Sequence, residues 1–231
     1  MCDRALNIDS GNVLALSYLA MMHIVPVVEA RSTDPQADIR QADELVSRAL
    51  ALDPNFYAAH FAKAYVLMGQ NRTQEAVIEG ERSLSLNPSF IDAYYALCAA
   101  NNFLGRPDRA LELADKAIRL SPRDPFLRVL YHMKGWALFM KQQDDQAIEW
   151  LRRAEGGTVF TELILASALA LTGRQAEARE TLKRYSTMTG VTTTTIGQLR
   201  KQQLSLADNP TWVAYNERLF EGLRKAGMPE E

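Results

Sequence analysis

Three histidines, two cysteines and the adjacent carboxylates Asp144 and Asp145 are the residues considered first, because side chains of these types can bind a metal or transfer protons in this chain of 231 residues. His23, His60 and His132 are far apart in the sequence, and none pairs with another histidine or a cysteine at the spacing of a zinc site. Asp144 and Asp145 stand together between two expected helices, which favours a solvated helix start over a metal site. The sequence also lacks a glycine-rich phosphate loop and a GxSxG elbow. We therefore expect no catalytic residue, no metal and no cofactor.

Charge and composition exclude several classes of partner. Lys and Arg number 26 and Asp and Glu number 28, so the net charge of −2 gives no overall field for nucleic acid or an anionic membrane. The longest apolar run, residues 21–28, is broken by Pro26 and is too short to span a bilayer. Cys2 and Cys98 are far apart, and the first residues are charged rather than apolar. These features predict a cytoplasmic protein that binds neither nucleic acid nor membrane.

A short phrase that ends in proline recurs along the chain. It occurs as ALALDP at residues 49–54, SLSLNP at residues 83–88 and AIRLSP at residues 117–122, so its prolines are 34 residues apart. Small residues recur with the same mean period, at Ala42, Ala76, Ala110, Ala147 and Ala178. Proline cannot continue the hydrogen-bond ladder of a helix and forces the residue before it out of the α region. The phrase therefore predicts the end of a helix, and its period predicts repeated helix pairs.

This pattern resembles the tetratricopeptide repeat, whose helix pairs have the same period. A small residue stands at the eighth place of each unit, as Ala20, Ala64, Cys98, Gly135 and Ala166, where it lets the first helix approach the second. Gly105 and Gly173 stand at equivalent places in the turns between helices. The resemblance implies an all-α fold, namely a right-handed superhelical solenoid of about five helix pairs with a C-terminal capping helix.

The repeat boundaries predict one solenoid domain over residues 1–231. The expected repeats are residues 13–54, 57–90, 91–124, 128–158 and 159–190, and the first contains a loop from Pro26 to Pro35. Residues 1–10 match the end of a repeat, so we expect the chain to begin inside a longer protein or in a degenerate cap. Residues 193–227 are expected to form a degenerate repeat and a capping helix, which starts at Asn209 and Pro210 and stops at Gly227.

In tetratricopeptide proteins the first helix of each pair lines a concave groove, and the resemblance places aromatic and methionine side chains there. The predicted groove residues are Met21, Phe61, Tyr65, Met68, Tyr95, Asn102, Phe103, His132, Trp136 and Phe139. Such a surface suits a protein or peptide with apolar anchors, and replacing Trp136 and Tyr95 with alanine is expected to abolish binding. Ordinary packing is the alternative, including occupation of the groove by the chain's own last helix. Self-association into a homodimer is left open.

Three segments resemble a narrower group of proteins. Residues 119–125 (RLSPRDP), the Gly-Trp-Ala sequence at residues 135–137 and the tail at residues 219–230 are similar to tetratricopeptide regions of two bacterial protein classes. These regions follow the catalytic domain of class III adenylate or guanylate cyclases, or the DNA-binding domain of winged-helix transcriptional activators. The resemblance implies a regulatory region of a signalling protein, because no cyclase or winged-helix residues have counterparts here. A free-standing scaffold or adaptor is the alternative.

Overall fold

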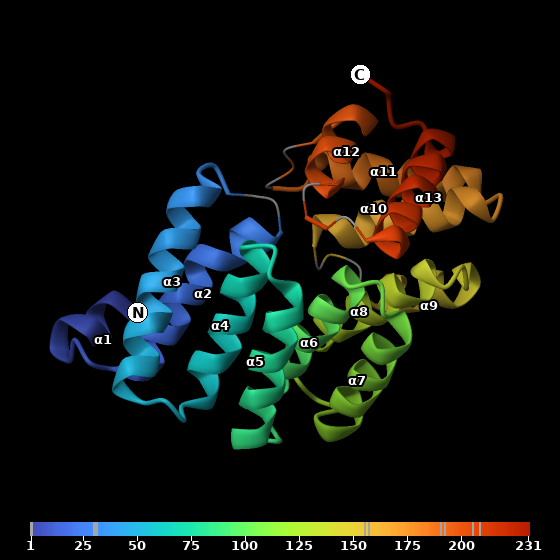
Figure 1. Ribbon diagram of the computed structural model, residues 1–231. Helices are drawn as coiled ribbons and strands as arrows, with labels where there is room; N and C mark the ends of the chain where they lie inside the picture. The colour runs from blue at the N-terminus through green and yellow to red at the C-terminus, as the bar shows by residue number, and fades with distance from the viewer. Residues whose placement is uncertain are drawn as a thin grey trace. The chain divides into compact units, whose positions relative to one another are not determined.

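The computed structural model describes residues 2–29, 32–154, 156, 158–189, 191, 193–204, 206–207 and 209–231. These residues form thirteen helices and no strand (Figure 1), which confirms the all-α fold class. The chain divides into two compact units, residues 1–100 and residues 101–231, and the expectation of a single domain stays a prediction. Within the described residues, no helix combines the length and apolarity needed to cross a lipid bilayer.

Paired helices account for most of both units. The first unit contains α1 (Cys2–Ile8), α2 (Val13–Val28), α3 (Pro35–Leu52), α4 (Tyr57–Gly69), α5 (Thr73–Leu86) and most of α6 (Ile91–Phe103). The second unit contains the end of α6, α7 (Pro107–Leu120), α8 (Leu127–Met140), α9 (Asp144–Arg153), α10 (Val159–Leu171), α11 (Gln175–Thr187), α12 (Ile196–Leu204) and α13 (Pro210–Ala226). Odd-numbered α3, α5, α7, α9 and α11 are the second helices of the pairs.

Left-handed residues close the turns between the two helices of a pair. They are Asn71, Gly105, Gln142 and Gly173, with φ of 59°, 68°, 58° and 79°. In each turn the next residue donates its N–H to the carbonyl five residues earlier, at 2.8 to 3.0 Å, as in a Schellman motif. Glycine at two of these places was predicted from the sequence, whereas the left-handed asparagine and glutamine were not.

The proline phrase ends the second helices as expected. The N–H groups of Asp53, Asn87 and Ser121 bond to the carbonyls four residues earlier, at 3.0, 2.9 and 3.0 Å, and each of these residues leaves the helical conformation before proline. The Asp53 carboxylate also accepts the N–H of Asn55 at 2.9 Å, which fixes the turn.

The first repeat differs from the prediction at Pro26. The helix α2 continues through this proline to Val28, so the prediction of a loop that starts at Pro26 is wrong. Proline has no N–H for the Met22 carbonyl, so α2 loses one bond of its ladder at this point, but Glu29 still donates its N–H to Val25 at 2.9 Å and closes the last turn. Residues 30 and 31 of the expected loop lie outside the described residues.

The small residue at the eighth place allows two helices to approach closely. A Cβ atom added to Gly135 in α8 would lie 2.6 Å from Cγ and 3.2 Å from the backbone nitrogen of Leu151 in α9. Ala20, Ala64, Cys98 and Ala166 occupy the same place in the other first helices and are at most 1% exposed. The predicted role of this place in helix packing is therefore confirmed at Gly135.

The last helix begins and ends as its sequence predicts. The Asn209 side chain caps α13 by accepting the N–H of Trp212 at 2.9 Å, and Pro210 is the first helical residue. Gly227 ends the helix in the left-handed conformation with φ of 107°. The helix α13 packs mainly on α10 and also contacts α8, α11 and α12.

Candidate functional site

The second unit holds half of the predicted groove residues, and it buries all of them. Asn102, Phe103, His132, Trp136 and Phe139 are each at most 8% exposed. The structure brings these side chains together on the end of α6 and on α8, but it leaves no open aromatic surface there. The sequence left open that these residues would be packed in the core beneath the last helix. In this unit they are buried in that way.

Two aromatic residues of α13 cover the predicted groove of the second unit. The Trp212 ring centre lies 5.0 Å from that of Phe103 and 5.8 Å from that of Trp136. The Tyr215 ring centre lies 5.9 Å from that of Phe139 in an edge-on arrangement. Clusters of this kind bury large apolar areas and gain further from their ring geometry. The helix α13 is therefore part of the core of this unit.

Polar contacts fix the position of α13 on the helix pairs of the second unit. The Arg218 guanidinium pairs with Asp144 and lies 4.5 Å above the ring of Phe139. The Asn209 amide donates to the carbonyl of Phe103 at 2.7 Å. Asp144 does start the helix α9, as predicted, but its side chain is not solvated, because it is only 15% exposed and is paired with Arg218.

The first unit holds the other five predicted residues on α2, α4 and α6. Phe61, Met68 and Tyr95 are buried, whereas Met21 and Tyr65 remain half-buried. The Phe61 and Tyr65 rings meet edge-on with their centres 5.3 Å apart. We call the surface around Met21 and Tyr65 the inner face of the first unit. It keeps an aromatic and methionine character and is partly open.

Carboxylates surround the inner face of the first unit. The Tyr18 hydroxyl donates to Asp92 at 3.3 Å, and burial together with the Asp92 charge raises the pKa of Tyr18 to about 12. Burial also raises the pKa of Tyr65, and the charges of Glu29 and Asp92 add to this effect. The prediction missed Tyr18, because its place in the repeat is not one of those that line the groove in tetratricopeptide proteins.

Each histidine has a local partner. His23 contacts Asp38 at 3.1 Å, and His132 contacts the Thr161 hydroxyl at 3.1 Å. His60 contacts Glu79 at 2.6 Å, and this bond is the main cause that raises the pKa of His60. Among the described residues no group of three histidine, cysteine or carboxylate side chains could hold a metal ion. Each of the three histidines therefore has a structural contact.

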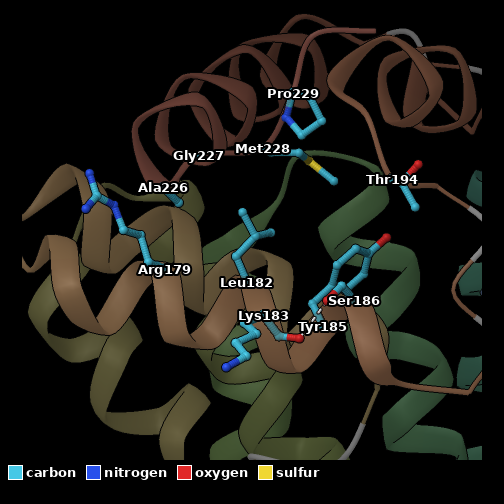
Figure 2. Close-up of a pocket in the computed structure, with 10 residues that line it drawn as sticks. All are labelled: Arg179, Leu182, Lys183, Tyr185, Ser186, Thr194, Ala226, Gly227, Met228 and Pro229. Atoms are coloured by element: carbon cyan, nitrogen blue, oxygen red, sulfur yellow. Dashed lines mark hydrogen bonds between the residues drawn. The ribbon is translucent and has the colours of Figure 1, made fainter.

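A pocket of about 370 Å³ lies between α11 and the residues that follow α13 (Figure 2). Leu182, Tyr185 and Met228 point into it, and Arg179 stands at its edge. The Tyr185 hydroxyl donates to the Thr193 carbonyl at 2.6 Å. The lining contains no histidine, cysteine or carboxylate, so it offers no pair for acid–base or nucleophilic chemistry.

Comparison with known proteins identifies the type of repeat. Residues 29–89 match the family model described as tetratricopeptide repeat. The protein O-mannosyl-transferase TMTC1 of Homo sapiens is 30% identical over 115 residues, which are 49% of this chain and only 13% of that protein. This chain therefore corresponds to only a small part of that relative's length.

Two solved structures share the fold over nearly the whole chain. PilW, described as a widely conserved type IV pilus biogenesis factor, is 19% identical with a TM-score of 0.64, and the match covers 93% of this chain and 90% of that one. A tetratricopeptide repeat protein from Parabacteroides merdae is 14% identical with a TM-score of 0.61, and the match covers 97% and 75%. This chain therefore matches the tetratricopeptide repeat over residues 29–89 and has the fold of tetratricopeptide repeat proteins.

Proposed function

We propose that this chain is a non-catalytic module that binds a protein or peptide partner on the inner face of its first unit. One observation carries the proposal: Trp136 is buried among the aromatic residues of α13, whereas Tyr65, at the same place in its own repeat, is only half-buried. Tyr65 and Met21 pack against the core cluster of the first unit, but each keeps part of its surface exposed. Large aromatic side chains beside adaptable methionines are typical of surfaces that bind apolar anchors.

A displayed peptide library selected on the full chain tests this function. Peptides are expected to bind the wild-type chain and to lose at least about tenfold in affinity with Met21→Lys or Tyr65→Lys, because either lysine places a charge among apolar contacts. Ile78→Lys is the matched control, since Ile78 is 65% exposed on α5. Failure to select any peptide, or equal binding by both inner-face variants, would contradict the proposal.

The double substitution of Trp136 and Tyr95 by alanine is a poor test of binding. Trp136 is 7% exposed and Tyr95 is also 7% exposed, so both changes leave cavities in the core. Loss of binding in that variant would follow from unfolding as readily as from a lost contact. The half-buried residues of the inner face give the cleaner experiment.

A finer proposal concerns the protein to which this module belongs. The resemblance at residues 119–125 and in the tail supports a cytoplasmic regulatory region of a bacterial adenylate cyclase-like protein or transcriptional regulator. A free-standing scaffold or adaptor is the alternative. The genomic reading frame upstream of Met1 distinguishes the two, since a cyclase or DNA-binding domain in frame supports the first and a stop codon supports the second.

A further inference from the structure

An arginine of α9 lies over two aromatic rings in the second unit. The Cζ atom of Arg153 is 4.4 Å from the ring centre of Tyr131 and 4.3 Å from that of Trp150. The two rings are in contact with each other, and their centres are 5.4 Å apart. Arg153 is exposed, whereas both rings are half-buried. We call these three residues the Arg153 cluster, in which the rings support a guanidinium group that faces solvent.

The cations next to this cluster have carboxylate partners, whereas Arg153 has none. Lys134 pairs with Asp115, and Arg152 pairs with Glu177. In the described part of the chain, no ion pair or hydrogen bond engages the Arg153 side chain beyond its two ring contacts. A guanidinium group is planar, and its N–H donors can form two parallel bonds to one carboxylate. The donors of Arg153 are therefore open to a ligand.

The same three places of the second repeat hold a polar cluster with a carboxylate of its own. Aligned on the recurring small residues, the counterparts of the Arg153 cluster are His60, Glu79 and Arg82. His60 contacts Glu79 at 2.6 Å, and Arg82 donates to the Asn55 side chain at 2.8 Å. In the fourth repeat Trp150 stands at the place of Glu79. The fourth repeat therefore keeps the cation but lacks the carboxylate that accompanies it in the second.

A second arginine extends the site along α8. Arg128 stands three residues before Tyr131, and side chains at this spacing are neighbours on one side of a helix. Arg128 is exposed, and the residues that the structure describes give it no ion pair. Arginine and aromatic side chains are enriched in protein interfaces, where arginine pairs with carboxylates. Two guanidinium groups without counter-charges therefore lie next to half-buried rings on this surface.

We propose that the Arg153 cluster binds an acidic segment of a partner protein. One carboxylate of the segment accepts two N–H bonds from Arg153, and a neighbouring carboxylate pairs with Arg128. A protein segment suits the site better than a nucleic acid, because a polyanion extends its charge far beyond two arginines and this chain has a net charge of −2. The inference goes beyond the proposed function and uses no residue of the inner face of the first unit.

Two short labelled peptides serve as probes of this site. One alternates glutamate with serine, and the other has glutamine in place of every glutamate, so the two differ in charge but hardly in size. Fluorescence anisotropy with the full chain measures their affinities. The glutamate peptide is expected to bind at least about tenfold more tightly at low salt. The ratio is expected to fall in about 0.5 M NaCl, because salt screens exposed charges.

Arg153→Gln tests the arginine itself, and Arg152→Gln is its matched control. The two changes remove the same charge from adjacent residues, but Arg152 already pairs with Glu177. Arg153→Gln is expected to weaken the glutamate peptide at least about tenfold, whereas Arg152→Gln is expected to bind it like the wild type. Arg153→Lys keeps the charge but loses the planar donors, so it is expected to weaken binding at least about threefold. Circular dichroism checks that the variants remain folded.

Three results would overturn the inference: equal affinity for the two peptides, no binding of either, or the same loss of affinity in Arg153→Gln and Arg152→Gln. Tighter binding of a single-stranded oligonucleotide than of the glutamate peptide would also overturn it, because the ligand would then be a nucleic acid. The test is independent of the inner-face experiment. Tyr65→Lys is expected to leave the glutamate peptide bound, and Arg153→Gln is expected to leave the library peptides of the inner face bound.

Discussion

At the scale of single residues, burial gives two histidines opposite electrostatic roles. His132 is 5% exposed in α8, and burial lowers its pKa from 6.5 to about 4. His60 has a carboxylate partner in Glu79, and the bond between them raises its pKa. At low pH, His132 therefore lowers the free energy of unfolding, whereas His60 raises it.

The low pKa of His132 predicts a loss of stability in acid. Below about pH 6.5 the unfolded chain binds a proton at this ring that the folded chain does not, so the free energy of unfolding falls as pH falls towards 4. The expected loss from this residue is about 3 kcal/mol between pH 7 and pH 4. Urea denaturation at several pH values should show a flatter profile for His132→Leu than for the wild type.

His60→Gln is the matched control for this experiment. Because the pKa of His60 is raised, its contribution is present below about pH 6.5 and is lost as pH rises through its folded value. Removing this ring should therefore make the loss of stability in acid steeper. If His132→Leu and the wild type show the same dependence of stability on pH, burial does not keep the ring of His132 neutral.

The left-handed turns make a second prediction at the residue scale. Gln142 adopts φ of 58°, whereas Gly173 at the equivalent place adopts 79°. A non-glycine residue is strained in this region, so Gln142→Gly is expected to stabilise the protein by about 0.5 to 1 kcal/mol, and Gly173→Ala to destabilise it by about as much. Thermal denaturation measures both, and a lower melting temperature for Gln142→Gly would contradict the interpretation.

At the scale of elements, α13 depends on a close approach to α10. A Cβ atom at Gly222 would lie 2.6 Å from the backbone oxygen and 2.8 Å from Cα of Ser167. Backbone atoms cannot move aside as a flexible side chain can, so the two helices would have to separate. Glycine at this position sets how deeply α13 lies on the repeats.

Gly222→Ala is therefore expected to destabilise the protein although alanine favours helix. The gain from helix propensity is about 1 kcal/mol, and overpacking against backbone costs about 1 to 3 kcal/mol or more. Gly11→Ala is the control, because a Cβ there meets no atom closer than 3.4 Å. Chemical denaturation measures both variants, and a Gly222→Ala protein as stable as the wild type would show that α13 can shift without cost.

At the scale of the whole molecule, each unit has a core of its own. Buried residues of α2, α3 and α4 form one cluster in the first unit, and aromatic residues of α8 and α13 pack together in the second. Contacts in repeat arrays are made mainly between neighbours, so a local defect is expected to remain local. Stability should therefore differ along the chain.

Trp212→Ala tests this expectation. Loss of a buried tryptophan costs about 3 to 5 kcal/mol, so amides of α8, α10 and α13 should exchange hydrogen faster. Amides of α2 and α4 should keep the protection that they have in the wild type. Val213→Ala, at a residue 36% exposed on the same helix, should change neither group. Equal acceleration in α4 and α10 would show that the chain opens as one cooperative body.

Local patterns were sufficient to predict the helices of this protein and most of their ends. The proline phrase, the small residues of the eighth place and the Asn209 cap act through contacts within one helix or one pair, so they are visible in the sequence. The end of α2 was the exception: proline lacks the N–H of the helical ladder and so predicts a break at residue 26, whereas the helix continues through it to Val28.

The candidate site was only partly predictable. The repeat predicted a surface position for Met21 and Tyr65, which are half-buried, but it could not show that Trp136 and Phe139 would be covered, or that Tyr18 and Met22 would remain exposed. The exposure of a side chain depends on which other parts of the chain pack against it. Two residues at the same place in their repeats are therefore equally exposed only when the helices around them are also equivalent. The sequence by itself determined the repeated helix pairs, whereas the docking of α13 on α8 and α10 decided that the aromatic residues of the second unit are buried, because burial depends on contacts between helices that are far apart in the sequence.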